Sequence, residues 1–197
     1  MNIHDFRKPG NPVQDIFVNR WSPRAMSGEE IDESTLMSLF EAARWAPSSN
    51  NNQPWRFIYA RRNTPRWEVF FSLLAEGNQV WAKEAAVLIV VISKTTFDSG
   101  KPARTHSYDA GAAWVSLALQ GSLLDLVVHG MQGFDYDRAK QELRVPDDYQ
   151  VEAMIAIGHH GKKENLPGDL QEREFPSPRK RVSEIALEGM FKKSDGA

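Results

Sequence analysis

"AAVLIVVIS", residues 85–93, is the longest apolar run in the chain and the stretch around which a fold can be built. Apolar residues fill it up to Ile92, so a strand formed here would bury both of its faces. Such a strand lies in the interior of a sheet. A helix that crosses a bilayer needs roughly 20 apolar residues, far more than this run provides. We therefore predict the central strand of a globular fold.

Other segments show the periodicity of strands or helices. Strand patterns occur in "WRFIYA" (55–60) and "YQVEAMIAIG" (149–158). Helical patterns occur at 31–43, 65–74 and 135–143. Helices and strands therefore intermix, which predicts one α+β domain over residues 1–197. Its core is expected at about residues 16–185, between extended or frayed ends.

The first of these helices has signals at both ends. "SGEE" (27–30) has the spacing of a capping box between Ser27 and Glu30, so the helix is expected to begin there. It should end before Pro47, because the residue preceding a proline is pushed out of the helical region.

A longer helix is expected from Ser107 to about Val128, in "SYDAGAAWVSLALQGSLLDLVV". Its residues are small or apolar on nearly every side of the helix. A helix of that kind is buried, either in a large core or between two subunits.

Composition excludes several classes of function. A formal net charge of −2 gives no general attraction to nucleic acid or to an anionic membrane. The absence of cysteine excludes disulfides, thiolate nucleophiles and cysteine-based metal sites, so redox chemistry would need a borrowed cofactor. No secretory signal pattern opens the chain, and a cytoplasmic protein is expected.

Catalytic and metal motifs are also missing. We expect surface or loop positions for the five histidines, which are His4, His106, His129, His159 and His160. None of them has metal-binding spacing with a carboxylate, and the sequence contains no GxSxG, GxGxxG or P-loop motif. We predict no catalytic side chain and no metal site.

Two basic stretches could bind an anion. In an extended backbone, "NRWSPR" (19–24) would place Arg20, Ser22 and Arg24 on one side, where guanidinium groups suit phosphate oxygens. "SPRKR" (177–181) is a second basic group. Each could equally be an ordinary charged surface. If both met around one anion, they would form a phosphate site.

Two polar stretches could bind the rest of a ligand. "APSSNNNQPW" (46–55) gathers small hydrogen-bonding side chains, either as a turn or as a surface that recognises a polar ligand. In "HGMQGFD" (129–135), two glycines would let backbone amides near Gln132 approach a ligand, unless this is a plain turn.

Taken in order, "RWSPR", "ARWAPSSNNNQPW", "GNQVW", "HGMQGFD" and "PRKR" resemble the nitroreductase family of FMN-dependent oxidoreductases. The resemblance spans about residues 16–185 and implies a central mixed sheet flanked by helices, in an intertwined homodimer with FMN at the interface. The residues that it assigns to FMN are Arg20, Ser22, Arg24, Pro47, Ser48, Ser49, Asn51, Asn78, Gln132, Gly133, Arg179 and Arg181.

The resemblance assigns these residues to different parts of FMN. Arg20, Ser22 and Arg24 match positions on the phosphate, ribityl chain and pyrimidine edge, while Arg179 and Arg181 match a basic pair on the phosphate. Asn78 matches a ligand of the isoalloxazine ring, and Gln132 with Gly133 matches a loop whose backbone amide faces flavin N5. The residues Pro47, Ser48, Ser49 and Asn51 match positions that reach the flavin from the partner subunit.

The activity implied is reduction of a nitroaromatic, a quinone or a related small-molecule acceptor by NADH or NADPH, in ping-pong turnover on FMN. The alternatives are a flavin-binding storage or sensor protein, or a specialised member such as a dehalogenase or flavin-cleaving enzyme. Two departures bear on the substrate. Trp81 stands where some members carry a lysine, and only a short loop, "KTTFDSGKPARTHS", precedes the long helix, where larger members carry extra helical cover.

Overall fold

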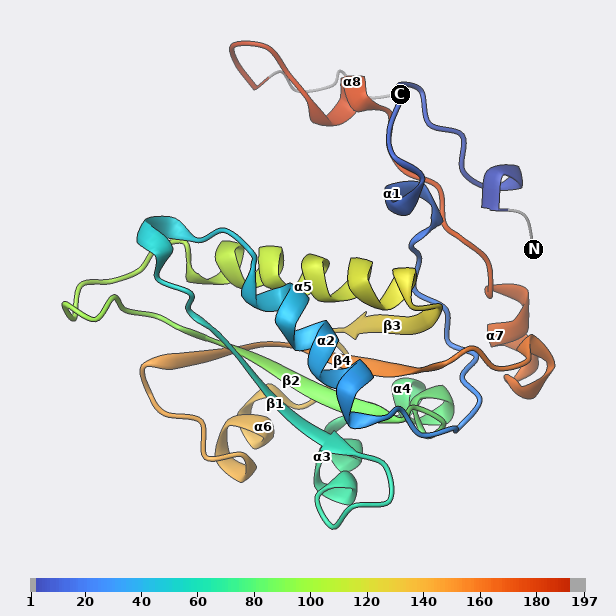
Figure 1. Ribbon diagram of the computed structural model, residues 1–197, viewed down its shortest axis with the longest axis horizontal. Helices are drawn as coiled ribbons and strands as arrows, with labels where there is room; N and C mark the ends of the chain where they lie inside the picture. The colour runs from blue at the N-terminus through green and yellow to red at the C-terminus, as the bar shows by residue number, and fades with distance from the viewer. Residues whose placement is uncertain (1–2, 192–197) are drawn as a thin grey trace.

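The computed structural model describes residues 3–191 (Figure 1). One sheet contains the strands β1 (Trp55–Arg61), β2 (Val87–Lys94), β3 (Leu126–Met131) and β4 (Tyr149–His159). Their order is β1-β2-β4-β3, and each of the three pairings is antiparallel. The expectation of a mixed sheet is therefore wrong for the described residues of one chain. The strands β2 and β3 run in the same direction but do not pair, because β4 lies between them and is antiparallel to both.

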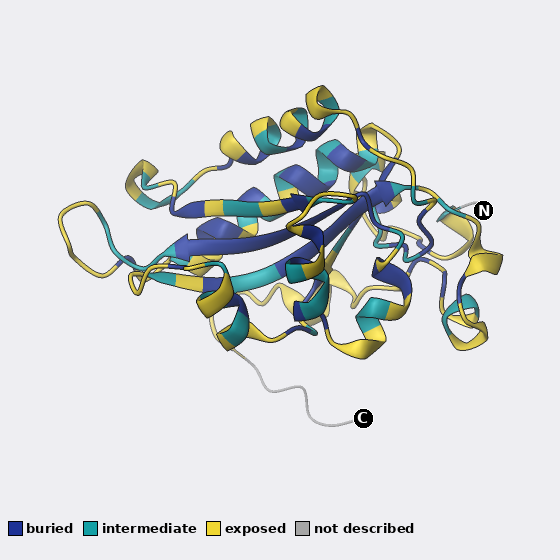
Figure 2. Ribbon diagram, turned by 90° about the horizontal axis from the view of Figure 1, so that it is seen from below, coloured by how far each residue is buried: buried dark blue, intermediate teal, exposed yellow. Residues whose placement is uncertain are grey.

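Helices cover both faces of this sheet, which confirms the α+β class (Figure 2). The α-helices of the described residues are α1 (Asp15–Asn19), α2 (Glu33–Arg44), α3 (Trp67–Leu73), α4 (Glu76–Ala82), α5 (His106–Leu123), α6 (Tyr136–Glu142), α7 (Gly168–Glu172) and α8 (Val182–Ile185). Short 3-10 helices occur at η1 (Ile3–Asp5), η2 (Ser49–Asn51) and η3 (Lys163–Asn165).

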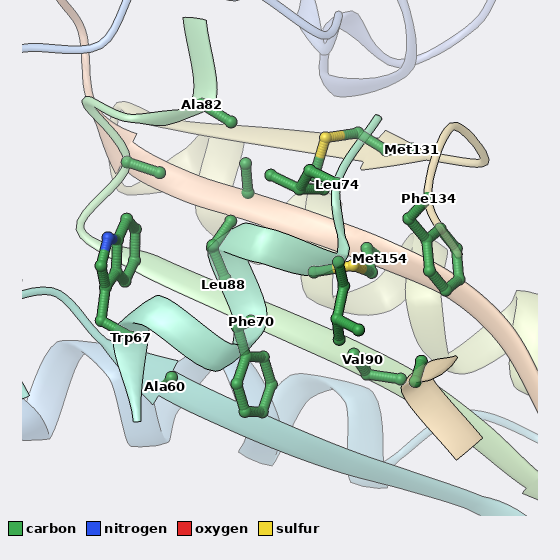
Figure 3. Close-up of a cluster of buried hydrophobic side chains, with 14 of the residues drawn as sticks. Ala60, Trp67, Phe70, Leu74, Ala82, Leu88, Val90, Met131, Phe134 and Met154 are labelled. Carbon is green, nitrogen blue, oxygen red and sulfur yellow. The ribbon is translucent and has the colours of Figure 1, made fainter. Parts of the chain in front are cut away.

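The strand β2 is central, as predicted, and divides the core into two layers. Its alternate side chains Leu88, Val90 and Ile92 pack with α3, α4 and α6, in the cluster of Figure 3. The intervening Val87, Ile89 and Val91 pack with α2 and α5. This strand is buried on both faces because each face meets a helical layer.

The start of α2 lies later than the capping box predicted. Asp32 is the N-cap, and its carboxylate accepts a hydrogen bond of 2.9 Å from the backbone of Thr35. Ser27 instead accepts from the backbone of Glu29, within the loop. Two possible N-cap residues, Ser27 and Asp32, lie close together in sequence, and the helix begins after Asp32, which is nearer its first buried turn.

The long helix α5 ends at Leu123, and the strand β3 follows it. The prediction of one helix to Val128 is wrong because Asp125, with φ of 55°, turns the chain back onto the sheet. "HGMQGFD" therefore starts inside a strand, and only its later residues form a loop.

The two terminal segments run side by side, away from the sheet (Figure 1). The rings of Phe6 and Phe175 stack with centroids 5.7 Å apart, and Arg7 donates from Nε to the carbonyl of Ser177 at 3.1 Å. Apart from Phe191 itself, the frayed tail expected from Phe191 onward lies outside the described residues.

Candidate functional site

The segment after α1 holds the first three candidate residues in an extended backbone. Arg20 donates from Nη1 to the hydroxyl of Ser22 at 3.2 Å, so these two side chains lie on one side of the chain, as the alternation predicts. All three candidates, Arg24 included, are half-buried.

Arg24 is held by a carboxylate that sequence reasoning did not single out. Glu174 is buried, and its Oε1 accepts hydrogen bonds from the backbones of Arg24 at 2.7 Å and Ala25 at 2.9 Å. Its Oε2 lies 3.8 Å from Nη1 of Arg24. Glu174 therefore fixes the backbone at Arg24 and offsets part of that residue's charge.

His129 is a second residue that the sequence did not reveal. It lies on β3, not on the surface or in a loop, and donates from Nδ1 to the carbonyl of Pro23 at 2.8 Å. Its ring lies 4.5 Å from that of Trp81. Burial, together with the charges of Arg24 and Arg20, lowers the pKa of His129 to about 4. The imidazole is therefore neutral at neutral pH and connects the arginine segment to the sheet.

Two basic groups distant in sequence come together. The guanidinium charge of Arg179 acts on both Arg20 and Arg7 and, with burial as the larger cause, lowers the pKa of each. Arg179 itself donates to the carbonyl of Ser177 at 3.2 Å and is exposed. Arg181 is exposed at the N-cap of α8 and has no ion pair with a described residue.

The helix α4 and the loop after β3 form the next part of the site. Asn78 donates from Nδ2 to the carbonyl of Gly133 at 2.9 Å, and the backbone of Ala75 donates to the same oxygen at 3.0 Å. A Cβ at Gly133 would lie 2.8 Å from Nδ2 of Asn78, so this close approach requires glycine. Gln132 is exposed and faces a cavity of about 390 Å³.

Trp81 connects these two parts. It is buried at 2% exposure, and its ring packs against that of His129. Arg24, Val80 and Trp81 line one cavity of about 390 Å³, which places the arginine segment beside α4.

The stretch after α2 forms a tight turn. Asn50, Asn51 and Gln53 have φ of 51°, 54° and 47°, a region that asparagine tolerates better than most residues. The backbone of Ser49 donates to the buried carboxylate of Asp109 at 3.1 Å, and the hydroxyl of Ser48 accepts from the backbone of Gln53 at 3.0 Å.

Pro47 and Asn51 are exposed on this turn, whereas the side-chain amide nitrogen of Asn52 is buried without a hydrogen-bond partner among the described residues.

This turn lies far from the arginine segment within one chain. Asp109, which holds the turn, is in the first turn of α5, whereas Trp21 and Pro23 line a cavity with Ser122 at the other end of that helix. An α-helix of this length extends about 27 Å. Figure 1 shows the turn after α2 and the segment after α1 at opposite ends of α5.

A serine, a histidine and a glutamate also meet beside α5, but not as a hydrolytic triad. The hydroxyl of Ser93 lies 2.7 Å from Nδ1 of His106, and Oε1 of Glu152 lies 3.4 Å from the same nitrogen. A triad uses opposite ring nitrogens for these two groups, and Ser93 is fully buried. No group of three or more potential metal ligands occurs among residues 3–191.

A family model described as "Nitroreductase family" matches residues 18–159, most of the chain. The chain belongs to the nitroreductase family. It is also 34% identical over 148 residues to a Mycolicibacterium smegmatis protein of uncharacterised function, covering 69% of this chain and 97% of that protein.

Two solved structures resemble this chain, and the resemblance covers nearly the full length of each solved protein. An oxidoreductase containing FMN has 47% identity and a TM-score of 0.92, with 95% of this chain and 97% of the other covered. A protein from Desulfovibrio desulfuricans, provisionally named a nitroreductase, was solved in complex with FMN. It has 27% identity and a TM-score of 0.71, with 92% and 99% covered.

A Streptomyces coelicolor relative, provisionally named NADH dehydrogenase/NAD(P)H nitroreductase, is 25% identical over 175 residues, covering 78% of this chain and 85% of that protein. In the chain described here, no helix within residues 3–191 has the length and apolar character needed to cross a membrane.

Proposed function

We propose that this protein binds FMN and uses NADH or NADPH to reduce a quinone, a nitroaromatic or a related acceptor by a ping-pong mechanism. The observation that carries the proposal is that Arg7 binds the carbonyls of both Arg20 and Ser177, which brings the two basic stretches together, in a member of this family. Relatives that contain FMN support the same cofactor.

The residues present fit this group. Arg20 donates to the hydroxyl of Ser22 and Arg179 to groups of residues 177–178, all of them neutral. Neither guanidinium is in an ion pair with a described carboxylate, so both charges remain available to a phosphate dianion.

Arg24 lines a cavity with Val80 and Trp81 of α4, the helix that also carries Asn78, and polar donors there would suit a flavin ring.

Bound FMN would supply the hydride chemistry. The chain's own contribution would be orientation and electrostatics. Arg20, Ser22 and Arg179 would hold the phosphate end, and the loop at Gln132 and Gly133, anchored to Asn78, would present a backbone amide to the ring. Donors fixed before the reaction stabilise negative charge on a reduced ring, and this requires no acidic or nucleophilic side chain.

A homodimer with FMN at the interface forms part of the proposal. The turn containing Pro47 and Asn51 lies at the far end of α5 from Arg20, so one chain does not bring both to one ligand. The apolar residues Val115 and Leu123 of α5 are 43% and 68% exposed in the single chain. A second copy packed along α5 would cover them and bring its own turn to the first copy's arginines.

The test is spectroscopic. The purified protein, or the apoprotein after addition of FMN, should show a bound-flavin spectrum that NADH or NADPH bleaches without oxygen and that a quinone restores. A protein that gains no flavin spectrum would exclude the proposal. Bound FMN that neither nicotinamide reduces would favour the storage or sensor alternative.

A further inference from the structure

Arg7 is buried at 9% exposure, although it lies outside the part of the chain that resembles the family. Its Nη1 donates to the carbonyls of Val18 at 2.8 Å and Arg20 at 2.7 Å, and its Nε donates to the carbonyl of Ser177 at 3.1 Å. One guanidinium thus joins the N-terminal segment, the start of the arginine segment and the C-terminal segment.

These bonds place Arg7 between the two parts of the proposed phosphate site. Arg20 is the residue whose carbonyl it binds, and Arg179 follows Ser177 by two positions. Three of its five N–H groups are used by carbonyls, and the two on Nη2 make no hydrogen bond to a described residue. The side chain can therefore hold the site together and still donate to a ligand.

The cluster of Arg7, Arg20 and Arg179 is cationic and lacks a counter-ion among the described residues. None of the nine ion pairs among residues 3–191 includes any of the three. The nearest buried carboxylate, that of Glu174, is directed to the backbone and side chain of Arg24. Burial, together with repulsion from Arg179 and Arg20, lowers the pKa of Arg7. A bound dianion would relieve this repulsion.

We propose that Arg7 is a positioning residue of an anion site for a phosphate monoester, which it completes by tying Arg20 to the segment that carries Arg179. Taking that monoester to be the phosphate of FMN rests on the proposed function above. The proposal adds a residue from the N-terminal segment to the site and makes the packing of both terminal segments part of phosphate recognition.

The experiment compares apoprotein affinities for FMN and for riboflavin, which lacks the phosphate, by quenching of flavin fluorescence. Arg7→Ala should weaken FMN binding about tenfold or more and change riboflavin binding by less than about twofold, because only FMN presents the dianion. Arg66→Ala is the matched control, since Arg66 is exposed at the start of α3 and has no ion pair with a described residue. If Arg7→Ala does not fold, Arg7→Lys carries the same comparison, because lysine keeps the charge but lacks the planar fork whose Nη1 and Nε reach the carbonyls of two separate segments.

An equal loss of affinity for FMN and riboflavin, or no loss for either, would overturn the proposal, because it would leave Arg7 with a structural role or none.

A second measurement separates this proposal from the proposed function. Inorganic phosphate should raise the thermal unfolding temperature of the unaltered apoprotein and raise that of Arg7→Ala clearly less. If the protein binds neither flavin, the proposed function fails, yet this difference would still support the anion site. Equal stabilisation of the two proteins by phosphate would overturn it.

Discussion

At the scale of single residues, the candidate site depends on side chains that fix the backbone of its arginine segment or offset part of an arginine's charge. These side chains do not take the place of a ligand. Glu174 binds the backbone at Arg24, and His129 binds the carbonyl of Pro23 between Arg24 and Ser22. Both are contributed by elements far from residues 20–24 in sequence. A motif of three alternating residues gives no indication of partners that arrive from a strand and from a C-terminal segment.

The neutral state of His129 has a consequence for acid stability. Its pKa is about 4 in the folded protein against an ordinary value of 6.5, so between these values the unfolded chain binds a proton that the folded chain does not. Stability therefore falls as pH decreases through this window, by about 3 kcal/mol in total from this one group.

His129→Asn tests this, because asparagine can still donate to the carbonyl of Pro23 but does not titrate. Urea unfolding between about pH 7 and pH 4 should show the unaltered protein losing about 3 kcal/mol more than the variant. Parallel curves for the two proteins would contradict the assignment.

At the scale of elements, α5 positions the polar turn after α2. Asp109, in its first turn, is 4% exposed and accepts from the backbone of Ser49 at 3.1 Å and from the hydroxyl of Thr105 at 3.3 Å. The turn has hydrogen bonds of its own, such as the one from the backbone of Asn51 to the carbonyl of Ser48 at 3.1 Å, but its residues at positive φ also need support from outside.

Asp109→Ala should therefore destabilise the protein by about 1–3 kcal/mol, since it leaves the backbone N–H of Ser49 without its partner. It should also weaken FMN binding if the turn contacts flavin. Asp109→Asn is the control, because its carbonyl oxygen can still accept and most of the stability should return. Urea denaturation and flavin titration measure the two effects, and an unchanged unfolding free energy in Asp109→Ala would refute the supporting role.

At the scale of the whole molecule, the proposed homodimer would bring together the two predicted parts of the site, which lie apart in one chain. A mixture of two defective variants tests this directly. Arg20→Ala would remove the proposed phosphate contact, and Asn51→Ala would remove the contact proposed for the turn. If each site takes Arg20 from one subunit and Asn51 from the other, a heterodimer of the two variants has one intact site.

Refolding the variants together should then restore about a quarter of the sites to full FMN affinity, on statistical pairing of subunits. Each variant refolded alone is the control. Failure of the mixture to exceed its components, with heterodimers demonstrated by differently tagged subunits, would show that the turn and Arg20 do not share a site.

The sequence alone determined what depends on local pattern. The structure confirms the central strand, the strands at 55–60 and 149–158, and the helices at 65–74 and 135–143. A run that is apolar on both faces, or a regular periodicity, can be recognised in a segment without knowing which other segment packs against it. The ordered polar motifs were sufficient to indicate the family, which the comparisons confirm. The individual flavin contacts remain predictions.

Only the tertiary structure decided the rest. The strand β3 was hidden in an apolar helix pattern, because the turn at Asp125 depends on packing against the sheet. The antiparallel order follows from the insertion of β4. The meeting of Arg7, Arg20 and Arg179, and the distance of the turn at Asn51 from them, are set by contacts between segments remote in sequence. Local patterns specify which elements form, whereas the long-range contacts that place their side chains exist only once the chain has folded.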